Sequence, residues 1–241
     1  MSPSPAACRS PRRTALVVHA HPEPASFSTA QMRVATATLE SAGYRVEVLD
    51  LYAIGFKAIL DRRDFNDAEA HFKPQAEQMK AFAAGSLPAD VAEHLRALQR
   101  ADLLVLSFPM WWFSLPAILK GWVDRVFVMG ALFGGSRGLF DDAAMVGRRA
   151  VLLISTGGSA QSFRNVRGGL GATNDLLLHV HHGMLRFVGY DVLEPVVTYG
   201  PAHLDEPQRE RALEDVREAF VRLDDRSFVA PIDGHDAAAA A

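Results

Sequence analysis

The chain has 241 residues, 49% of them hydrophobic and 22% charged, and carries a net charge of −3. This balance is typical of a globular protein with a sizeable core, and it provides no basic surface for nucleic acid. No apolar run approaches the roughly 20 residues that span a bilayer. The single cysteine, Cys8, cannot form an internal disulfide, so we expect a reducing, cytoplasmic location without a membrane span.

Composition changes near both ends of the chain and predicts a single domain between them. Residues 1–13 are rich in Pro, Ser and Arg without an apolar segment, and we interpret them as a flexible tail. Residues 226–241 lose hydrophobic periodicity and finish in five alanines, which predicts a disordered tail. The domain is therefore expected to span residues 14–225.

The domain begins with the pattern of a strand, a turn and a helix. Residues 14–20 (TALVVHA) are rich in β-branched residues and predict a buried strand. The turn at 21–28 offers Ser26 and Ser28 as caps for a helix that ends near residue 42. Residues 44–51 alternate in polarity, which favours a second strand nearer the edge of the sheet.

The next part is less regular. Residues 52–88 mix aromatic and charged residues, with weak helical spacing at 72–84. We expect a long connection that serves a site or an interface, because connections of this length are uncommon inside a compact domain. A helix follows at 88–100.

An aromatic turn lies at the centre of the sequence. The apolar run 102–108 predicts a buried strand, and Trp111, Trp112 and Phe113 follow it between two prolines. The second proline is well placed to start a helix that runs to about residue 129. Turns are normally solvated, so three aromatic residues here indicate a stacked ligand or a subunit interface, although such clusters are more often core.

The remaining elements complete an alternating order. The loop 130–147 contains five glycines. After it come predicted strands at 149–155 and 190–197 and predicted helices at 172–185 and 206–223. Strand and helix thus alternate five times, which predicts a doubly wound, five-stranded parallel sheet with helices on both faces.

Three turns are expected to meet at the carboxyl edge of this sheet, namely 21–28, 109–116 and 156–169. The first offers hydroxyls and backbone N–H groups at a helix N-terminus, a setting that attracts phosphate, and His21 adds a donor. The second offers the flat aromatic surface. In the third, Gly157 and Gly158 allow the backbone to approach a ring closely.

The sequence lacks the motifs of several other kinds of site, which disfavours those sites. Neither G-x-G-x-x-G nor the Walker pattern occurs, and Ser159 does not sit in a G-x-S-x-G elbow. Only His179 and His182 of the cluster at 179–182 share a helical face, and no acidic residue or cysteine stands at ligand spacing, so we expect no metal site.

Four blocks in order resemble the NAD(P)H:quinone oxidoreductases of the DT-diaphorase type. They are residues 15–21 with Ser26 and Phe27, residues 108–127 with the specific run PAILKGW, residues 155–159, and residues 192–195. The resemblance spans about residues 14–223. It implies a flavodoxin-like fold, a homodimer with FAD rather than FMN at the interface, and two-electron ping-pong reduction of quinones by NAD(P)H.

The resemblance also implies which residues form the site. Those implied to bind the flavin are His21, Ser26, Phe27, Ser28, Ala30, Pro109, Met110, Trp111, Trp112, Phe113, Ser155, Thr156, Gly157, Gly158 and Phe163. Those implied to contact the substrate are Phe113, Phe133 and Phe187. Phe163 aligns with a tyrosine of the animal enzymes, so backbone N–H groups near Gly157, or Arg164 or Arg167, are candidates to stabilise the reduced ring.

Other functions remain open from the sequence. An ancillary flavoprotein subunit of a transport system, a nitro- or azo-reductase, and an electron-carrier flavodoxin are the alternatives. The last is disfavoured because its relatives tend to be strongly acidic. The sequence does not decide between NADH and NADPH as donor.

Overall fold

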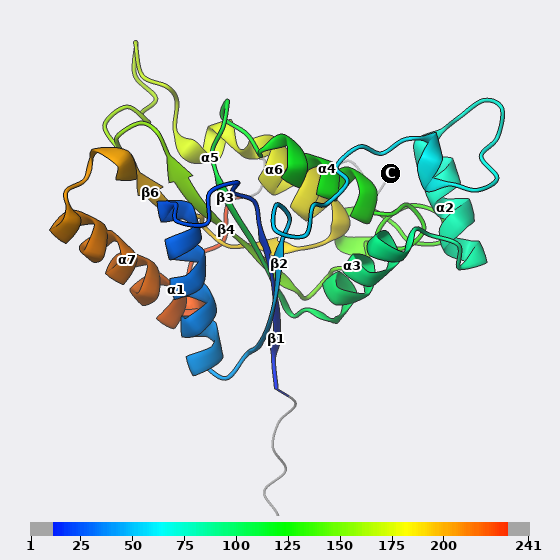
Figure 1. Ribbon diagram of the computed structural model, residues 1–241, viewed down its shortest axis with the longest axis horizontal. Coiled ribbons are helices and arrows are strands. Elements are labelled where there is room, and N and C mark those ends of the chain that lie inside the picture. Colours follow the sequence, from blue (N-terminus) through cyan, green and yellow to red (C-terminus); the bar gives the residue numbers. More distant parts are fainter. Residues whose placement is uncertain (1–11, 231–241) are drawn as a thin grey trace, which may run out of the picture.

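The computed structural model of the chain describes residues 12–230 and shows a sheet between two layers of helices (Figure 1). The sheet has six parallel strands in the order β2-β1-β3-β4-β5, and β6 also pairs with β4. The strands are β1 (Thr14–His19), β2 (Arg45–Asp50), β3 (Leu103–Pro109), β4 (Arg149–Thr156), β5 (Asp191–Val192) and β6 (Val196–Tyr199). The predicted doubly wound parallel sheet is confirmed.

The count of six rather than five arises at the last predicted strand, 190–197. Its ends pair with different parts of β4, and Leu193, Glu194 and Pro195 lie between them. Leu193 still donates its N–H to Ala150 of β4 and also forms an isolated bridge with Phe228, whereas Glu194 donates its N–H to Ser227 and Pro195 has no N–H group to donate. One apolar run therefore becomes the two short strands β5 and β6.

Alternate residues of each strand supply two separate hydrophobic cores. Ala15 and Val17 of β1 pack beneath α1 (Phe27–Ser41) and α7 (Glu206–Val221). Leu16 and Val18 point to the opposite face, where α3 (Ala89–Arg100) and α4 (Ala117–Val126) cover the sheet (Figure 1). Buried on both faces, the strands are nearly continuous apolar runs, which is why the sequence predicted them well.

Helix α4 also anchors the irregular connection that precedes α3. A Cβ atom at Gly121 would lie 2.1 Å from the backbone oxygen of Ala58, so only glycine allows this approach. Gln78 of α2 (Pro74–Ala84) donates to the backbone oxygen of Asp124 over 2.9 Å. The glycine of the PAILKGW run is thus explained by helix–connection packing.

The predicted helix at 172–185 forms in several short pieces. They are α5 (Thr173–Leu176), α6 (Leu178–Val180), a π-helical turn (His181–Leu185) and a 3-10 turn (Arg186–Val188). The backbone widens into a π turn at His181–Leu185, and Val180, His181 and Leu185 of this region are buried.

The end of the described chain returns to the sheet. Val229 donates its N–H to the oxygen of Val192, and Glu194 donates its N–H to the oxygen of Ser227. Ser227 and Val229 fall within the segment 226–241, which was expected from the sequence to be a tail. The rest of the two predicted tails, residues 1–11 and 231–241, lies outside the described residues. No helix within residues 12–230 combines the length and apolar character needed to cross a membrane.

Candidate functional site

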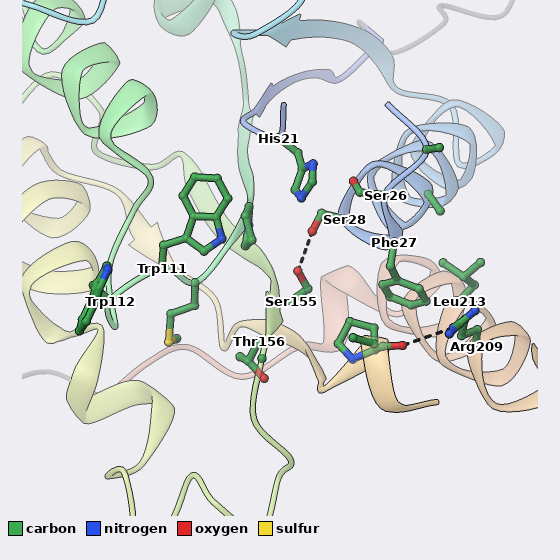
Figure 2. A pocket seen from close by; sticks show the side chains of 17 residues that line it. His21, Ser26, Phe27, Ser28, Trp111, Trp112, Ser155, Thr156, Arg209 and Leu213 are labelled. Atoms are coloured by element: carbon green, nitrogen blue, oxygen red, sulfur yellow. Dashed lines mark hydrogen bonds between the residues drawn. The ribbon is translucent and has the colours of Figure 1, made fainter. Parts of the chain in front are cut away.

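A cavity of about 810 Å³ opens at the carboxyl ends of β1, β3 and β4 (Figure 2). The strand order reverses between β1 and β3, which is where ligands bind in sheets of this kind. The cavity is lined by these predicted flavin-binding residues: His21, Ser26, Phe27, Ser28, Ala30, Pro109, Met110, Trp111, Trp112, Ser155, Thr156 and Gly157. The three predicted turns therefore meet around one space.

One wall of the cavity is the N-terminus of α1. Ser26 caps this helix, and its Oγ accepts the backbone N–H of Thr29 over 3.1 Å. Ser28 and Ser155 join α1 to β4 through hydroxyls 2.6 Å apart. The first N–H groups of an α-helix have no acceptor within the helix and carry the positive end of its dipole. This wall is suited to an anionic group such as a phosphate.

His21 faces the same wall. His21 Nδ1 lies 3.0 Å from the backbone nitrogen of Glu23 and 3.2 Å from the backbone oxygen of the same residue, so these contacts fit either tautomer of the ring. Its ring centre lies 6.3 Å from that of Trp111 across the cavity (Figure 2). Both contacts hold the ring through Nδ1, so Nε2 is the ring nitrogen left for a ligand beside the tryptophan.

A buried histidine behind this wall holds the turn at 21–28 to the sheet. His19 is fully buried, with Nδ1 3.1 Å from Ser107 Oγ and Nε2 3.1 Å from Thr29 Oγ1. Thr29 in turn donates to the backbone oxygen of Glu23 over 3.2 Å. Burial lowers the pKa of His19 to about 4, so the ring is neutral near pH 7. The network was not predicted, because a histidine inside an apolar strand resembles core.

Two further walls of the cavity, one formed by the aromatic turn after β3 and one by Gly157 after β4, differ in chemistry. Trp111 and Trp112 follow β3, and the side chain of Trp112 is 93% exposed. At Gly157 a Cβ atom would meet nothing within 4 Å, so the space in front of this residue is open. An aromatic wall and an open glycine wall thus border the same cavity, as a flat ring would require.

The structure also contributes lining residues that sequence reasoning missed. Pro201, Ala202, Arg209 and Leu213 extend the cavity past the N-terminus of α1. Arg209 lies on α7 and donates to the oxygen of Pro201 over 3.3 Å (Figure 2). The spacing of Arg209 in an amphipathic helix gave no signal, because an exposed arginine there is ordinary.

Several predicted residues do not line this cavity. The ring of Phe163 lies 5.5 Å from that of Tyr199 and 3.1 Å from the position that a Cβ atom of Gly158 would take. Phe133 and Phe187 form a separate aromatic cluster, with ring centres 5.2 Å apart. Phe113, Gly158 and Arg164 also lie outside the residues that border the cavity. Their predicted roles at the flavin or substrate remain predictions.

The histidines at 179–182 are separated by the short helices. His179 Nε2 lies 2.7 Å from Ser114 Oγ, whereas His181 is buried. Among residues 12–230, no three His, Cys, Asp or Glu side chains gather as metal ligands would.

Comparison with known proteins identifies the family. A model described as "Flavodoxin-like fold" matches residues 13–220. The chain is 38% identical over 194 residues to NAD(P)H dehydrogenase (quinone) 1 of Cavia porcellus, covering 79% of this chain and 70% of the relative. The chain belongs to the flavodoxin-like quinone oxidoreductases.

Two solved structures share this fold. A Klebsiella pneumoniae protein has 34% identity and a TM-score of 0.84, over 90% of this chain and 87% of its own. The NAD(P)H:quinone oxidoreductase of Methanothermobacter marburgensis has 28% identity and a TM-score of 0.69, over 88% and 98%.

The cavity of this flavodoxin-like quinone oxidoreductase fits the flavin that its family implies. The donor set at α1 suits a phosphate group, since hydroxyls, helix N–H groups and His21 converge there. The open space before Gly157 is a place that a Cβ atom and its substituents would fill. The first observation suits the phosphate of a flavin, and the second leaves room for its ring.

Proposed function

We propose that the chain is an FAD-dependent NAD(P)H dehydrogenase that reduces quinones or similar flat electrophilic acceptors by two electrons. The observation that carries the proposal is the one cavity of about 810 Å³ shared by a helix N-terminus, an aromatic turn and Gly157. A bound flavin supplies the redox chemistry, accepting a hydride from NAD(P)H and passing two electrons to the acceptor.

The chain's own residues bind and orient. Ser26 and the first N–H groups of α1 would hold the phosphates, and His21 would contact the same region through Nε2. Met110 and Trp111 would line one side of the ring. A nicotinamide and then the acceptor would stack in the same slot, so ping-pong kinetics are expected.

FAD rather than FMN is supported by the length of the cavity. Beyond the α1 terminus it continues to Pro201, Ala202, Arg209 and Leu213. FMN, which carries a single phosphate, would leave this extension empty, whereas the adenosine diphosphate portion of FAD would occupy it. Arg209 is the cation available for the second phosphate.

A homodimer would complete the substrate slot. Trp112 and Phe113 are 93% and 40% exposed, and Phe133 and Phe187 cluster away from the cavity of their own chain. A second copy that brought its phenylalanines against the exposed turn would cover all four rings. The single cysteine fits the reducing cytoplasm, which we propose as the location.

The test is the flavin released on denaturing purified protein, together with steady-state turnover of NADH and NADPH with a simple benzoquinone. We expect one FAD per chain, many turnovers per flavin, and parallel double-reciprocal lines. A folded protein that binds neither FAD nor FMN would contradict the site. A flavin that is reduced once without turnover would favour an ancillary or carrier flavoprotein instead.

Filling the open glycine wall is expected to exclude the flavin without disturbing the fold. In Gly157→Val the new side chain meets no atom of the chain at Cβ but projects into the proposed ring position. We expect FAD affinity to fall by at least about tenfold, because a ring displaced from its wall loses more than ~1.4 kcal/mol. Fluorescence titration of the apo-protein measures this.

Gly183→Val is the matched control for this substitution. Gly183 also has no atom within 4 Å of its Cβ position, and it does not line the cavity. The control is expected to bind FAD like the wild type. If Gly157→Val and Gly183→Val bound FAD with equal affinity, the flavin ring would not lie against Gly157.

A further inference from the structure

The aromatic turn has an unusual backbone. Trp111 and Ser114 exchange two backbone hydrogen bonds of 3.2 and 3.0 Å, so Trp112 and Phe113 form a two-residue turn. Their φ angles are +50° and +59°, the left-handed region that such turns require and that glycine or asparagine normally occupies. Bulky residues with positive φ are strained, and they persist only where surrounding contacts hold them.

Contacts at the two ends of the turn supply this restraint. On the N-terminal side, the N–H of Met110 donates to the oxygen of Ser155 over 2.8 Å. On the C-terminal side, Ser114 Oγ lies 2.7 Å from Nε2 of His179, which belongs to α6. Trp112 itself is 93% exposed, so packing of its own ring does little to fix the turn.

The turn is also the aromatic wall of the cavity. Met110, Trp111 and Trp112 line the cavity, and Ser114 comes directly after the strained pair. Ser114 is the end of the turn that lies away from β3 in the chain, so a change at Ser114 alters the turn from that end. The hydrogen bond to α6 is the side-chain contact that ties this end of the turn to a second element.

We propose that His179 is a positioning residue for the aromatic wall: through Ser114 it holds Trp112 and Phe113 in the left-handed turn, so that a flat ligand meets a preformed surface. The proposal rests on the proposed function, because it assigns the cavity to a flavin and its flat substrates. His179 touches neither; it acts by keeping the turn in the binding geometry, which reduces the ordering that a ligand must impose.

The test is FAD affinity of the apo-protein, measured by quenching of tryptophan fluorescence, in Ser114→Ala, His179→Ala and the double variant. Each single change is expected to weaken FAD binding about fivefold, the usual worth of one such hydrogen bond. The double variant is expected to be no weaker than either single one, because both remove the same contact. The melting temperature of each single variant is expected to fall by no more than about 4 °C, so that the protein stays folded in the binding assay.

Two further variants separate positioning from other effects. His179→Gln places an amide near the position of Nε2 and is expected to restore most of the affinity. Arg96→Ala removes an exposed side chain from α3, which does not line the cavity, and is expected to change nothing. Additive losses in the double variant, or no rescue by glutamine, would overturn the proposal. So would wild-type affinity in both single variants. A wild-type protein that binds no flavin would instead contradict the proposed function.

Discussion

Replacing Arg125 with leucine is expected to lower the free energy of unfolding by about 3–5 kcal/mol, because it leaves a buried carboxylate without its main partner. The Arg125 side chain is 2% exposed, and its Nη2 lies 2.8 Å from Asp64, whose side chain is 5% exposed. Arg125 also donates to Asp90 over 2.6 Å and to the backbone oxygen of Lys57 over 3.0 Å. One guanidinium thus joins α4, α3 and the irregular connection.

The electrostatics of this cluster explain the size of the effect. Burial alone would lower the pKa of Arg125, but its hydrogen bonds to Asp90 and Asp64 outweigh burial and raise the pKa. In the variant, Lys57 remains 3.0 Å from Asp64, so part of the charge stays compensated. Urea unfolding followed by circular dichroism measures the loss.

Lys120→Leu provides a control on the same helix. Lys120 forms an ion pair with Asp124 at 2.6 Å, but both side chains are about half exposed, at 46% and 45%. Water screens such a pair, and its loss is expected to change stability by less than about 1 kcal/mol. If Arg125→Leu were no less stable than Lys120→Leu, the buried cluster would not hold the connection.

The sheet and the three turns could be predicted because their signals are local. Strands buried on both faces are continuous apolar runs, and parallel strands place the turns after them at one edge. Residues such as Ser26, Trp111 and Gly157 therefore came together as expected. The resemblance to a known family carried the rest of the site.

The features that escaped prediction depend on contacts between distant segments. The extra residue of the π turn at His181–Leu185 has no periodic signature, so the region read as one helix. Arg209 reaches the cavity only because α7 packs beside α1. The link between Ser114 and His179 joins residues 65 positions apart, and neither residue type is unusual in its own segment.

Acid is expected to destabilise the protein through its buried histidines, and His181→Leu is expected to remove part of that loss. His181 is 2% exposed, and neither ring nitrogen has a hydrogen-bond partner among the described residues. Burial lowers its pKa from 6.5 to about 4. Between these values the unfolded chain binds the proton and the folded chain does not, so stability falls as the pH drops from 6.5 towards 4.

The expected magnitude follows from the two pKa values. At pH 5 the loss from His181 amounts to about 2 kcal/mol relative to pH 8. His181→Leu abolishes this loss and also removes two unpaired buried nitrogens, so the variant is expected to be the more stable protein already at pH 8, by about 1 kcal/mol. Its advantage is expected to grow to about 3 kcal/mol at pH 5. Urea midpoints at a series of pH values measure both quantities.

His19→Leu is the matched comparison, because burial gives His19 the same lowered pKa of about 4. Its acid loss is expected to vanish in the same way, but leucine leaves the hydroxyls of Ser107 and Thr29 without their imidazole partner. This variant is therefore expected to be less stable than the wild type at pH 8 and to approach it at pH 5. Two variants that lose equal parts of the acid destabilisation but differ from the wild type in opposite directions at pH 8 would separate proton linkage from hydrogen bonding. A His181→Leu curve that runs parallel to the wild type from pH 8 to pH 5 would show that His181 is protonated equally in both states.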